Sequence, residues 1–301
     1  EGDLIGIYSI NRLEWIIAEY ASYELKCINC PLYSTYGPES ISHILNETEM
    51  KICITSDVKA ISLYNDIISK YKNNLKDIIV MDPMEEKYIA MYKEKGITVH
   101  LWKDIMNEEF DFDILNEREK PTGEDLATIC YTSGTSGKPK GVMLTHLNFI
   151  SVISTFNQVR GSESIFTVGE NDYYLSYLPL AHAMERMCVS TLIAVGGKIG
   201  FYSGNPKNLQ LDIKILQPTI LVGVPRVFNI FKERISEIVN KKGIIVRTLF
   251  NLAVRYKIYR QKEGIYENYF LDALLFNKVK KEFGGKISKI LSGSAPLNPD
   301  V

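Results

Sequence analysis

The chain has 301 residues, of which 46% are hydrophobic and 24% are charged. A chain of this length and apolar content can bury a core without disulfides or metal ions, which excludes intrinsic disorder. Its 35 lysines and arginines are balanced by 36 aspartates and glutamates, which excludes a wholly basic nucleic-acid-binding protein, so we expect no nucleic-acid partner. The five cysteines lie mostly in apolar runs and predict buried free thiols in a reducing compartment.

In the first hundred residues, short apolar runs alternate with stretches of helical spacing. The runs predict strands at 4–8, 28–32, 51–55, 77–81 and 97–101. Helical spacing predicts helices over 11–25 and 58–71, and a third helix that begins at Pro38. Strands alternating with helices of this length favour crossover connections and an α/β fold with a mostly parallel sheet covered on both faces.

The segment 102–125 is rich in acidic residues and predicts a surface connector. After it the alternation resumes. Strands are expected at 127–131, 173–177, 198–202, 219–222 and 287–291. Helices are expected at 145–159, 181–194 and 206–216, and long helices from 225 to about 283. The polar, glycine-bearing segment 161–169 marks the predicted boundary between a first α/β subdomain, 1–168, and part of a second, 169–301.

The most informative segment, 131–141, reads YTSGTSGKPKG and lies between a predicted strand and a predicted helix. Its glycines let backbone N–H groups approach an anion, its hydroxyls can donate to phosphate oxygens, and its lysines add positive charge. The Walker A pattern fails, because Thr132 stands at its first glycine and Pro139 at its Ser/Thr position. The segment therefore predicts a polyphosphate-binding loop of another kind.

This segment resembles the phosphate-loop signature [YF]-T-S-G-[ST]-[TS]-G-x-P-K-G of the adenylate-forming enzymes, which include acyl-CoA synthetases and adenylation domains. Further similar strings follow in the family's order: GDLIGIYSINRLEW at 2–15, LPLAHAMER at 178–186, VPRVF at 224–228 and LSGSAPL at 291–297. The last three are most similar to the long-chain fatty acyl-CoA synthetases. The resemblance covers nearly the whole chain and implies two mostly parallel sheets with helices on both faces, as in the N-terminal core of an acyl-CoA synthetase.

The resemblance implies a two-step activation of a fatty acid. The carboxylate attacks the α-phosphorus of ATP to give an acyl-adenylate and pyrophosphate, and the thiol of CoA then attacks the acyl carbon and releases AMP. An adenylation domain that loads a carrier protein and a non-catalytic AMP-binding relative are the alternatives.

The resemblance also implies roles for individual residues. Lys140 would follow the leaving pyrophosphate, and His182 would lie beside the acyl carboxylate and the α-phosphate, although a lone histidine near an apolar stretch is often a core residue. Arg186, one helical turn after His182, stands where some relatives have an aromatic gate to an acyl tunnel. The residues implied to hold phosphate are Thr132, Ser133, Gly134, Thr135, Ser136, Gly137 and Lys140, and those implied to lie along the adenine are Gly293, Ser294 and Ala295.

The family's Mg²⁺-associated glutamate, its ribose-binding aspartate and its C-terminal domain with a catalytic lysine do not occur before Val301. We therefore expect the chain to be the N-terminal core of a larger ligase that uses ATP, Mg²⁺ and CoA, and to be inactive alone. The metal ligands are not predicted.

Charge is distributed unevenly along the chain. The segment 226–262 holds ten basic residues and two glutamates, whereas 101–125 holds nine acidic and three basic residues. The basic segment is interpreted as a solvated face, with peripheral membrane contact or binding of CoA phosphates as alternatives. The longest apolar stretch, 187–197, is too short to span a bilayer. We expect an intracellular protein, in the cytoplasm or on the cytosolic face of a membrane such as the endoplasmic reticulum.

Overall fold

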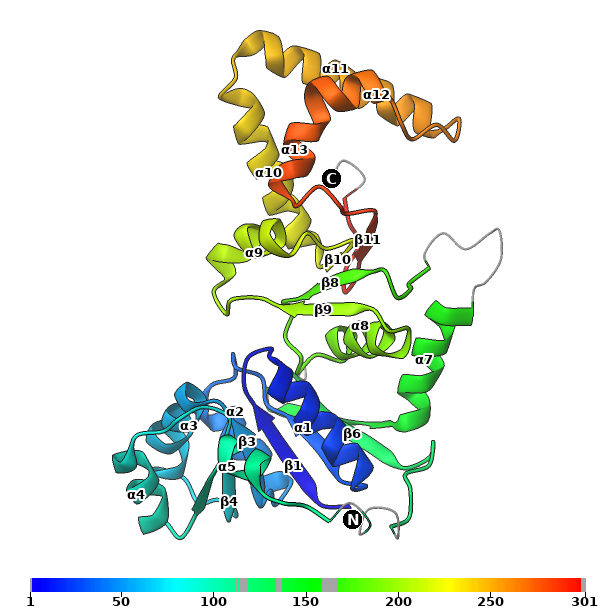
Figure 1. The fold of residues 1–301 in the computed structure, drawn as a ribbon. Coiled ribbons are helices and arrows are strands. Elements are labelled where there is room, and N and C mark those ends of the chain that lie inside the picture. Colours follow the sequence, from blue (N-terminus) through cyan, green and yellow to red (C-terminus); the bar gives the residue numbers. More distant parts are fainter. Residues whose placement is uncertain (1, 112, 114–117, 134–136, 159–166, 299–301) are drawn as a thin grey trace. The chain divides into compact units, whose positions relative to one another are not determined.

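The computed structural model describes residues 2–111, 113, 118–133, 137–158 and 167–298. The chain divides into two compact units (Figure 1). Unit 1 comprises 1–167 and 178–194, and unit 2 comprises 168–177 and 195–301. The chain therefore enters unit 2, returns to unit 1 for one helix, and enters unit 2 again. Separate subdomains at 1–168 and 169–301 stay a prediction.

Unit 1 is built on a seven-stranded sheet with the order β5-β4-β3-β1-β2-β6-β7. Its strands are β1 (Leu4–Tyr8), β2 (Ile28–Pro31), β3 (Ile52–Thr55), β4 (Asp77–Val80), β5 (Thr98–Leu101), β6 (Leu126–Ser133) and β7 (Pro139–Thr145). Neighbouring strands pair in parallel, except for β6 and β7, which are antiparallel. Because β2 lies on one side of β1 and β3 on the other, the strand order reverses beside β1. Open α/β sheets bind ligands outside the carboxyl ends of their strands at such a reversal.

Seven helices and one π-helical turn accompany this sheet in the described part of unit 1. They are α1 (Leu13–Glu24), α2 (Pro38–Glu47), α3 (Asp57–Leu63), the π-helical turn η1 (Tyr64–Ile68), α4 (Glu86–Glu94), α5 (Trp102–Asn107), α7 (His146–Gln158) and α8 (Ala183–Ala194). The sequence did not predict α4, and α5 begins the segment predicted as a connector. The strand β7 was also not predicted, although the helix expected at 145–159 agrees with α7.

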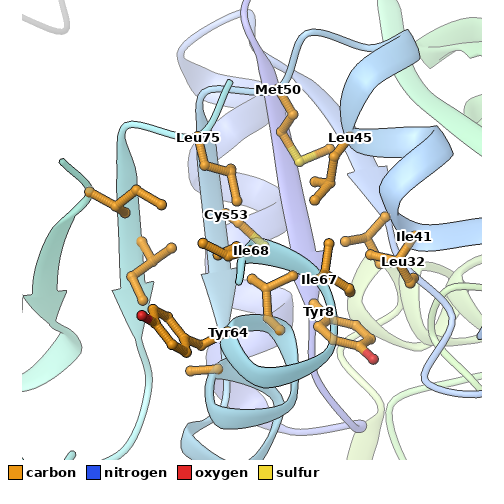
Figure 2. Close-up of a cluster of buried hydrophobic side chains, with 14 of the residues drawn as sticks. Tyr8, Leu32, Ile41, Leu45, Met50, Cys53, Tyr64, Ile67, Ile68 and Leu75 are labelled. Carbon is orange, nitrogen blue, oxygen red and sulfur yellow. The ribbon is translucent and has the colours of Figure 1, made fainter. Parts of the chain in front are cut away.

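The main core of unit 1 packs against one face of the sheet (Figure 2). Ile41 and Leu45 of α2 and Ile67 of η1 cover side chains from the strands, among them Tyr8 and Cys53. Each of these residues is less than 10% exposed. Burial of the apolar faces of α2 and η1 is therefore a main source of stability for this half of the sheet.

Unit 2 is a smaller layer of four parallel strands in the order β11-β10-β8-β9. The strands are β8 (Tyr173–Ser176), β9 (Lys198–Phe201), β10 (Ile220–Gly223) and β11 (Lys289–Ser292). The helical elements are the 3₁₀ turn η2 (Pro206–Asn208), α9 (Leu209–Leu216), α10 (Pro225–Asn240), α11 (Ile244–Gln261), α12 (Tyr269–Leu271), the π-helical turn η3 (Asp272–Phe276) and α13 (Asn277–Glu282). Everything from α10 to α13 is inserted between the neighbouring strands β10 and β11, and within unit 2 it extends away from the sheet (Figure 1).

The predicted fold class is confirmed, since both sheets are mostly parallel and helices accompany each of them. None of the described helices is both long enough and apolar enough to cross a bilayer.

Candidate active site

The predicted phosphate loop connects two antiparallel strands. We expected it between a strand and a helix, and that expectation was wrong, because β7 follows the loop directly. Gly137 has a φ of +91°, in the region where a side chain would be strained, so glycine suits this turn. Gly134, Thr135 and Ser136 lie outside the described residues, as does the side chain of Ser133.

The register of the hairpin places the two ends of the loop opposite each other. Thr132 pairs with Lys140, and both side chains are exposed. Directly paired residues share one face of the sheet, so the lysine and the hydroxyl are neighbours. A Cβ atom at Gly141 would lie 2.7 Å from Cγ2 of Ile129, which is too close for a side chain. Glycine therefore allows the close approach of β7 to Ile129 at this position. Lys138, by contrast, lies in the exposed turn before β7.

His182 lies in the turn that leads into α8, also in unit 1. Its Nδ1 atom faces the backbone N–H of Met184 at 3.2 Å and accepts a hydrogen bond. In the neutral ring the proton therefore sits on Nε2, which becomes the donor. Burial and the positive charge of Arg186 lower the pKa of His182, so the ring is neutral at physiological pH.

Aromatic side chains connect His182 with β6. The ring of Tyr33, which follows β2, lies edge-on to the His182 ring with centroids 6.5 Å apart. Tyr33 also contacts Tyr36 at a centroid distance of 5.0 Å, and the Tyr36 hydroxyl donates to the carbonyl of Tyr131 at 3.0 Å. Tyr131 opens the phosphate-loop string, so the structure brings His182 and this string together through the residues that follow β2.

The side chain of Asn11 makes two hydrogen bonds to the backbone just before His182. Its side chain is only 4% exposed and follows the carboxyl end of β1. The Nδ2 atom donates to the carbonyl of Leu178 at 2.6 Å, and Oδ1 accepts from the N–H of Leu180 at 3.0 Å. Nothing in the sequence points to a function for Asn11. An asparagine that follows a strand is typical of a turn. Its hydrogen-bond partners are 167 and 169 residues away in the sequence, so no local pattern indicates these contacts.

Arg186 lies within a buried polar cluster of unit 1. Its Nη1 atom lies 3.1 Å from Oε1 of Glu19 in α1 and 3.0 Å from Oγ1 of Thr128 in β6. Its Nη2 atom contacts the sulfur of Cys130, also in β6, and its guanidinium lies 5.3 Å from the ring centroid of Phe149. The Arg186 side chain is fully buried. At the position where some relatives have an aromatic gate, this chain has a buried ion pair.

The cluster fixes α8 to the strand that leads into the phosphate loop. Burial raises the pKa of the Glu19 carboxyl, while the charge of Arg186 and a 2.8 Å hydrogen bond from the Tyr23 hydroxyl oppose that rise. Cys130 precedes Tyr131 directly in β6, so Arg186 links the helix after His182 to the start of the loop. The sequence contained no sign of this pair, because its members are 167 residues apart.

The third predicted group, Gly293, Ser294 and Ala295, follows β11 in unit 2. The N–H of Gly293 donates to the carbonyl of Gly223 at 3.1 Å, and Ser294 has a left-handed φ of +68°. A Cβ atom at Gly223 would lie 2.9 Å from the Tyr177 hydroxyl oxygen. The carboxyl ends of β10 and β11 thus lie side by side, and the bend after β11 leaves the side chains of Ser294 and Ala295 exposed.

The sequence predicts no metal ligands before residue 301. In the described ranges, no three His, Cys, Asp or Glu side chains form a group that could hold a metal ion. Mg²⁺ is usually held by one or two carboxylates together with substrate phosphates, so the use of a magnesium complex of ATP stays a prediction.

Comparison with known proteins extends the similarity beyond these strings. The profile of the AMP-binding enzyme family matches residues 1–301. The chain belongs to the AMP-binding enzyme family. Fatty acyl-CoA synthetase B of Dictyostelium discoideum is 37% identical over 302 residues, which cover 99% of this chain and 43% of that relative. Long-chain-fatty-acid–CoA ligase 5 of Rattus norvegicus is 34% identical, with 100% of this chain and 44% of the relative covered. This AMP-binding chain thus spans less than half the length of these curated relatives.

Solved structures agree on the fold of this AMP-binding chain. The adenylation domain of a carboxylate reductase from Mycobacterium chelonae superposes with a TM-score of 0.71 at 17% identity, covering 100% of this chain and 44% of that one. A long-chain-fatty-acid–CoA ligase from Archaeoglobus fulgidus superposes with a TM-score of 0.60 at 17% identity, covering 100% and 47%. At these identities the likeness concerns the fold alone.

Proposed function

We propose that this chain is the ATP-binding core of a long-chain fatty acid–CoA ligase that forms AMP. The observation that carries the proposal is the β6–β7 hairpin, in which Thr132 and Lys140 stand opposite each other at the ends of the string 131–141. The names of the relatives from Dictyostelium discoideum and Rattus norvegicus support the choice of a fatty acid as substrate.

The first step joins two anions. A carboxylate oxygen of the fatty acid attacks the α-phosphorus of ATP, and the bond from that phosphorus to the oxygen of the leaving pyrophosphate breaks. Because the reactants repel each other, the site must neutralise charge and hold them in line. We assign the phosphates to residues 132–137 and the leaving pyrophosphate to Lys140, whose exposed ammonium is a mobile cation.

His182 acts in this step as a neutral hydrogen-bond donor. Because Nδ1 accepts from the backbone of Met184, the Nε2 proton is available to an oxygen of the carboxylate or of the α-phosphate. Asn11 and Arg186 are positioning residues, since each fixes the backbone on one side of His182. This assignment follows from contacts within unit 1.

In the second step the thiol of CoA attacks the acyl carbon, the bond to AMP breaks, and the thiol proton is released. We assign the adenine to the segment 293–295 of unit 2. We also propose that the protein acts inside the cell, in the cytoplasm or on the cytosolic face of a membrane, because all five of its cysteines are free thiols.

Exchange of labelled pyrophosphate into ATP tests the first step directly. The full-length protein that contains this chain is given the magnesium complex of ATP and one acid at a time: lauric, palmitic, oleic or benzoic acid, or alanine. We expect exchange with the fatty acids and a loss of roughly 100-fold or more in Lys140→Ala. Lys138→Ala is the matched control, since Lys138 is also exposed and is assigned no contact, and it should retain exchange.

The outcomes separate the alternatives. If no acid stimulates exchange, the proposal is wrong and the chain belongs to a non-catalytic relative. If exchange occurs but only a phosphopantetheinyl carrier protein, and not CoA, accepts the acyl group, the protein loads a carrier.

A further inference from the structure

The helix α11 has an exposed apolar stripe along one side. Ile245, Leu249, Leu252, Tyr256 and Tyr259 follow one another at spacings of four, three, four and three residues, which places them on one face of a helix. Between 42% and 74% of each of these residues is exposed. Lone exposed apolar residues are common on protein surfaces, but a continuous stripe of this length indicates an interaction site.

The opposite side of α11 is already covered within unit 2. Phe250 stacks against Phe276 of η3 with ring centroids 5.3 Å apart. The Nζ atom of Lys257 lies 2.8 Å from the carboxylate of Asp272, and Ala253 is buried. The inner face of α11 thus has its own packing partners, and the exposed stripe is a second, separate apolar face.

The charges of α11 all have the same sign. The helix contains Arg247, Arg255, Lys257 and Arg260 and no acidic residue. At 3.6 residues per turn, Arg255 and Arg260 lie on opposite sides of the stripe. Arg260 also lies over the Tyr256 ring, with its guanidinium carbon 5.8 Å from the centroid. The stripe is therefore apolar along its centre, with an arginine on each edge, of which Arg260 also pairs with Glu263 at 3.3 Å.

This pattern favours a lipid surface over a protein helix. A second copy of α11 would bring arginines against arginines across the stripe, where coiled coils place opposite charges. An interfacial helix, in contrast, combines an apolar face with lysines and arginines that meet anionic headgroups. Tyr256 and Tyr259 fit the same boundary, because each ring has an apolar body and a polar tip.

We propose that α11 is a membrane-docking helix that lays the stripe into the surface of an anionic phospholipid bilayer. Two further lysines, Lys241 and Lys242, are exposed at the turn before the helix and add positive charge near its beginning. The helix lies on the membrane and does not cross it, since its inner face stays packed against η3. No residue of this surface is assigned to the adenylation reaction.

Vesicle sedimentation without ATP tests the proposal separately from the enzymatic reaction. The full-length protein is mixed with vesicles of phosphatidylcholine alone or with added phosphatidylserine. We expect binding to the anionic vesicles that weakens as salt is raised. Leu249→Ser with Leu252→Ser should reduce the partition coefficient roughly 10- to 100-fold through lost apolar burial. Arg255→Glu with Arg260→Glu should reduce it roughly 10-fold or more.

The matched control is Leu13→Ser with Val58→Ser. These two residues are 60% and 67% exposed in unit 1, so the double variant removes the same kind of surface at a different place. It should bind vesicles like the unchanged protein. Equal vesicle binding by all variants, or equal binding to both vesicle types, would overturn the proposal.

A fluorescence experiment identifies what covers the stripe. Tyr259→Trp places an indole on it, and its emission should shift to the blue and be quenched by brominated lipid only when anionic vesicles are present. If the emission is already shifted without vesicles, another part of the full-length chain covers the stripe and the proposal is wrong. If the protein is dimeric and Leu249→Ser with Leu252→Ser makes it monomeric, a second copy is the occupant, which also overturns it.

Discussion

Replacing Arg186 by Met tests how the buried cluster holds α8 in place. The change removes the cation but leaves the Glu19 carboxylate, whose side chain is 2% exposed, among apolar groups. Removing one member of a buried ion pair costs about 3–5 kcal/mol, because the remaining charge has no compensation. Glu19 keeps a hydrogen bond from Tyr23, but a neutral hydroxyl replaces only part of the interaction with a guanidinium.

Hydrogen exchange of peptides from α1 and α8 in the full-length protein measures this cost locally. Since about 1.4 kcal/mol corresponds to a factor of ten, amides that exchange through opening of the cluster should exchange roughly 100- to 5,000-fold faster in Arg186→Met. Adding Glu19→Gln should restore most of the protection, because it removes the uncompensated charge and keeps an acceptor for Tyr23. Peptides from α9, in unit 2, serve as the internal control.

The effect should also depend on pH. Without Arg186, burial holds the folded-state pKa of Glu19 above its unfolded value of about 4.3. A raised carboxyl pKa means that the folded state binds the extra proton, so stability is present at low pH and is lost as pH rises through the folded pKa. The cost of Arg186→Met should therefore be larger at pH 8 than at pH 5. Unchanged exchange in Arg186→Met, or no rescue by Glu19→Gln, would refute the reasoning.

Three further predictions concern the same site. Gly141→Ala should destabilise the hairpin by about 1–3 kcal/mol in thermal unfolding, because the new Cβ atom meets Ile129. Gly169→Ala is the control, because a Cβ atom there would lie in open space. Equal loss of stability in the two variants would contradict the argument. His182 should titrate below about 6.5 by NMR, owing to burial and the nearby Arg186 charge, and a higher midpoint would contradict this cause. Asn11→Leu should lower pyrophosphate exchange by roughly 100-fold through displacement of the turn before His182, whereas full activity in a folded variant would remove Asn11 from the site.

Much of the architecture could be predicted because its signal is local. A buried parallel strand is a short apolar run, and a helix that covers it repeats every three or four residues, so β1 and α1 are evident from residues that are neighbours in sequence. The strand β7 lacked this signal. Lys140 and Gly141 are typical loop residues, so they do not predict a strand. The strand β7 forms because β6 provides an antiparallel partner.

The candidate site divides in the same way. The string 131–141 is contiguous and could be found from its composition and its resemblance to a family. Asn11 and Glu19 could not, because their importance comes from contacts with residues 178–186 that only the folded chain creates. Only part of the exposed stripe of α11 could be predicted. The basic character of this segment is evident from the sequence, but which of its apolar residues are exposed to solvent depends on how η3 packs against the helix.

The return of 178–194 to unit 1 has a consequence for the order of events during synthesis. Arg186 leaves the ribosome 167 residues after Glu19, roughly 10 to 30 s later at ordinary rates of translation. Until then, α1 and β6 carry a carboxylate and a thiol without the guanidinium that joins them. The nascent chain must therefore hold an unfinished first unit while it is already making the first strand of the second.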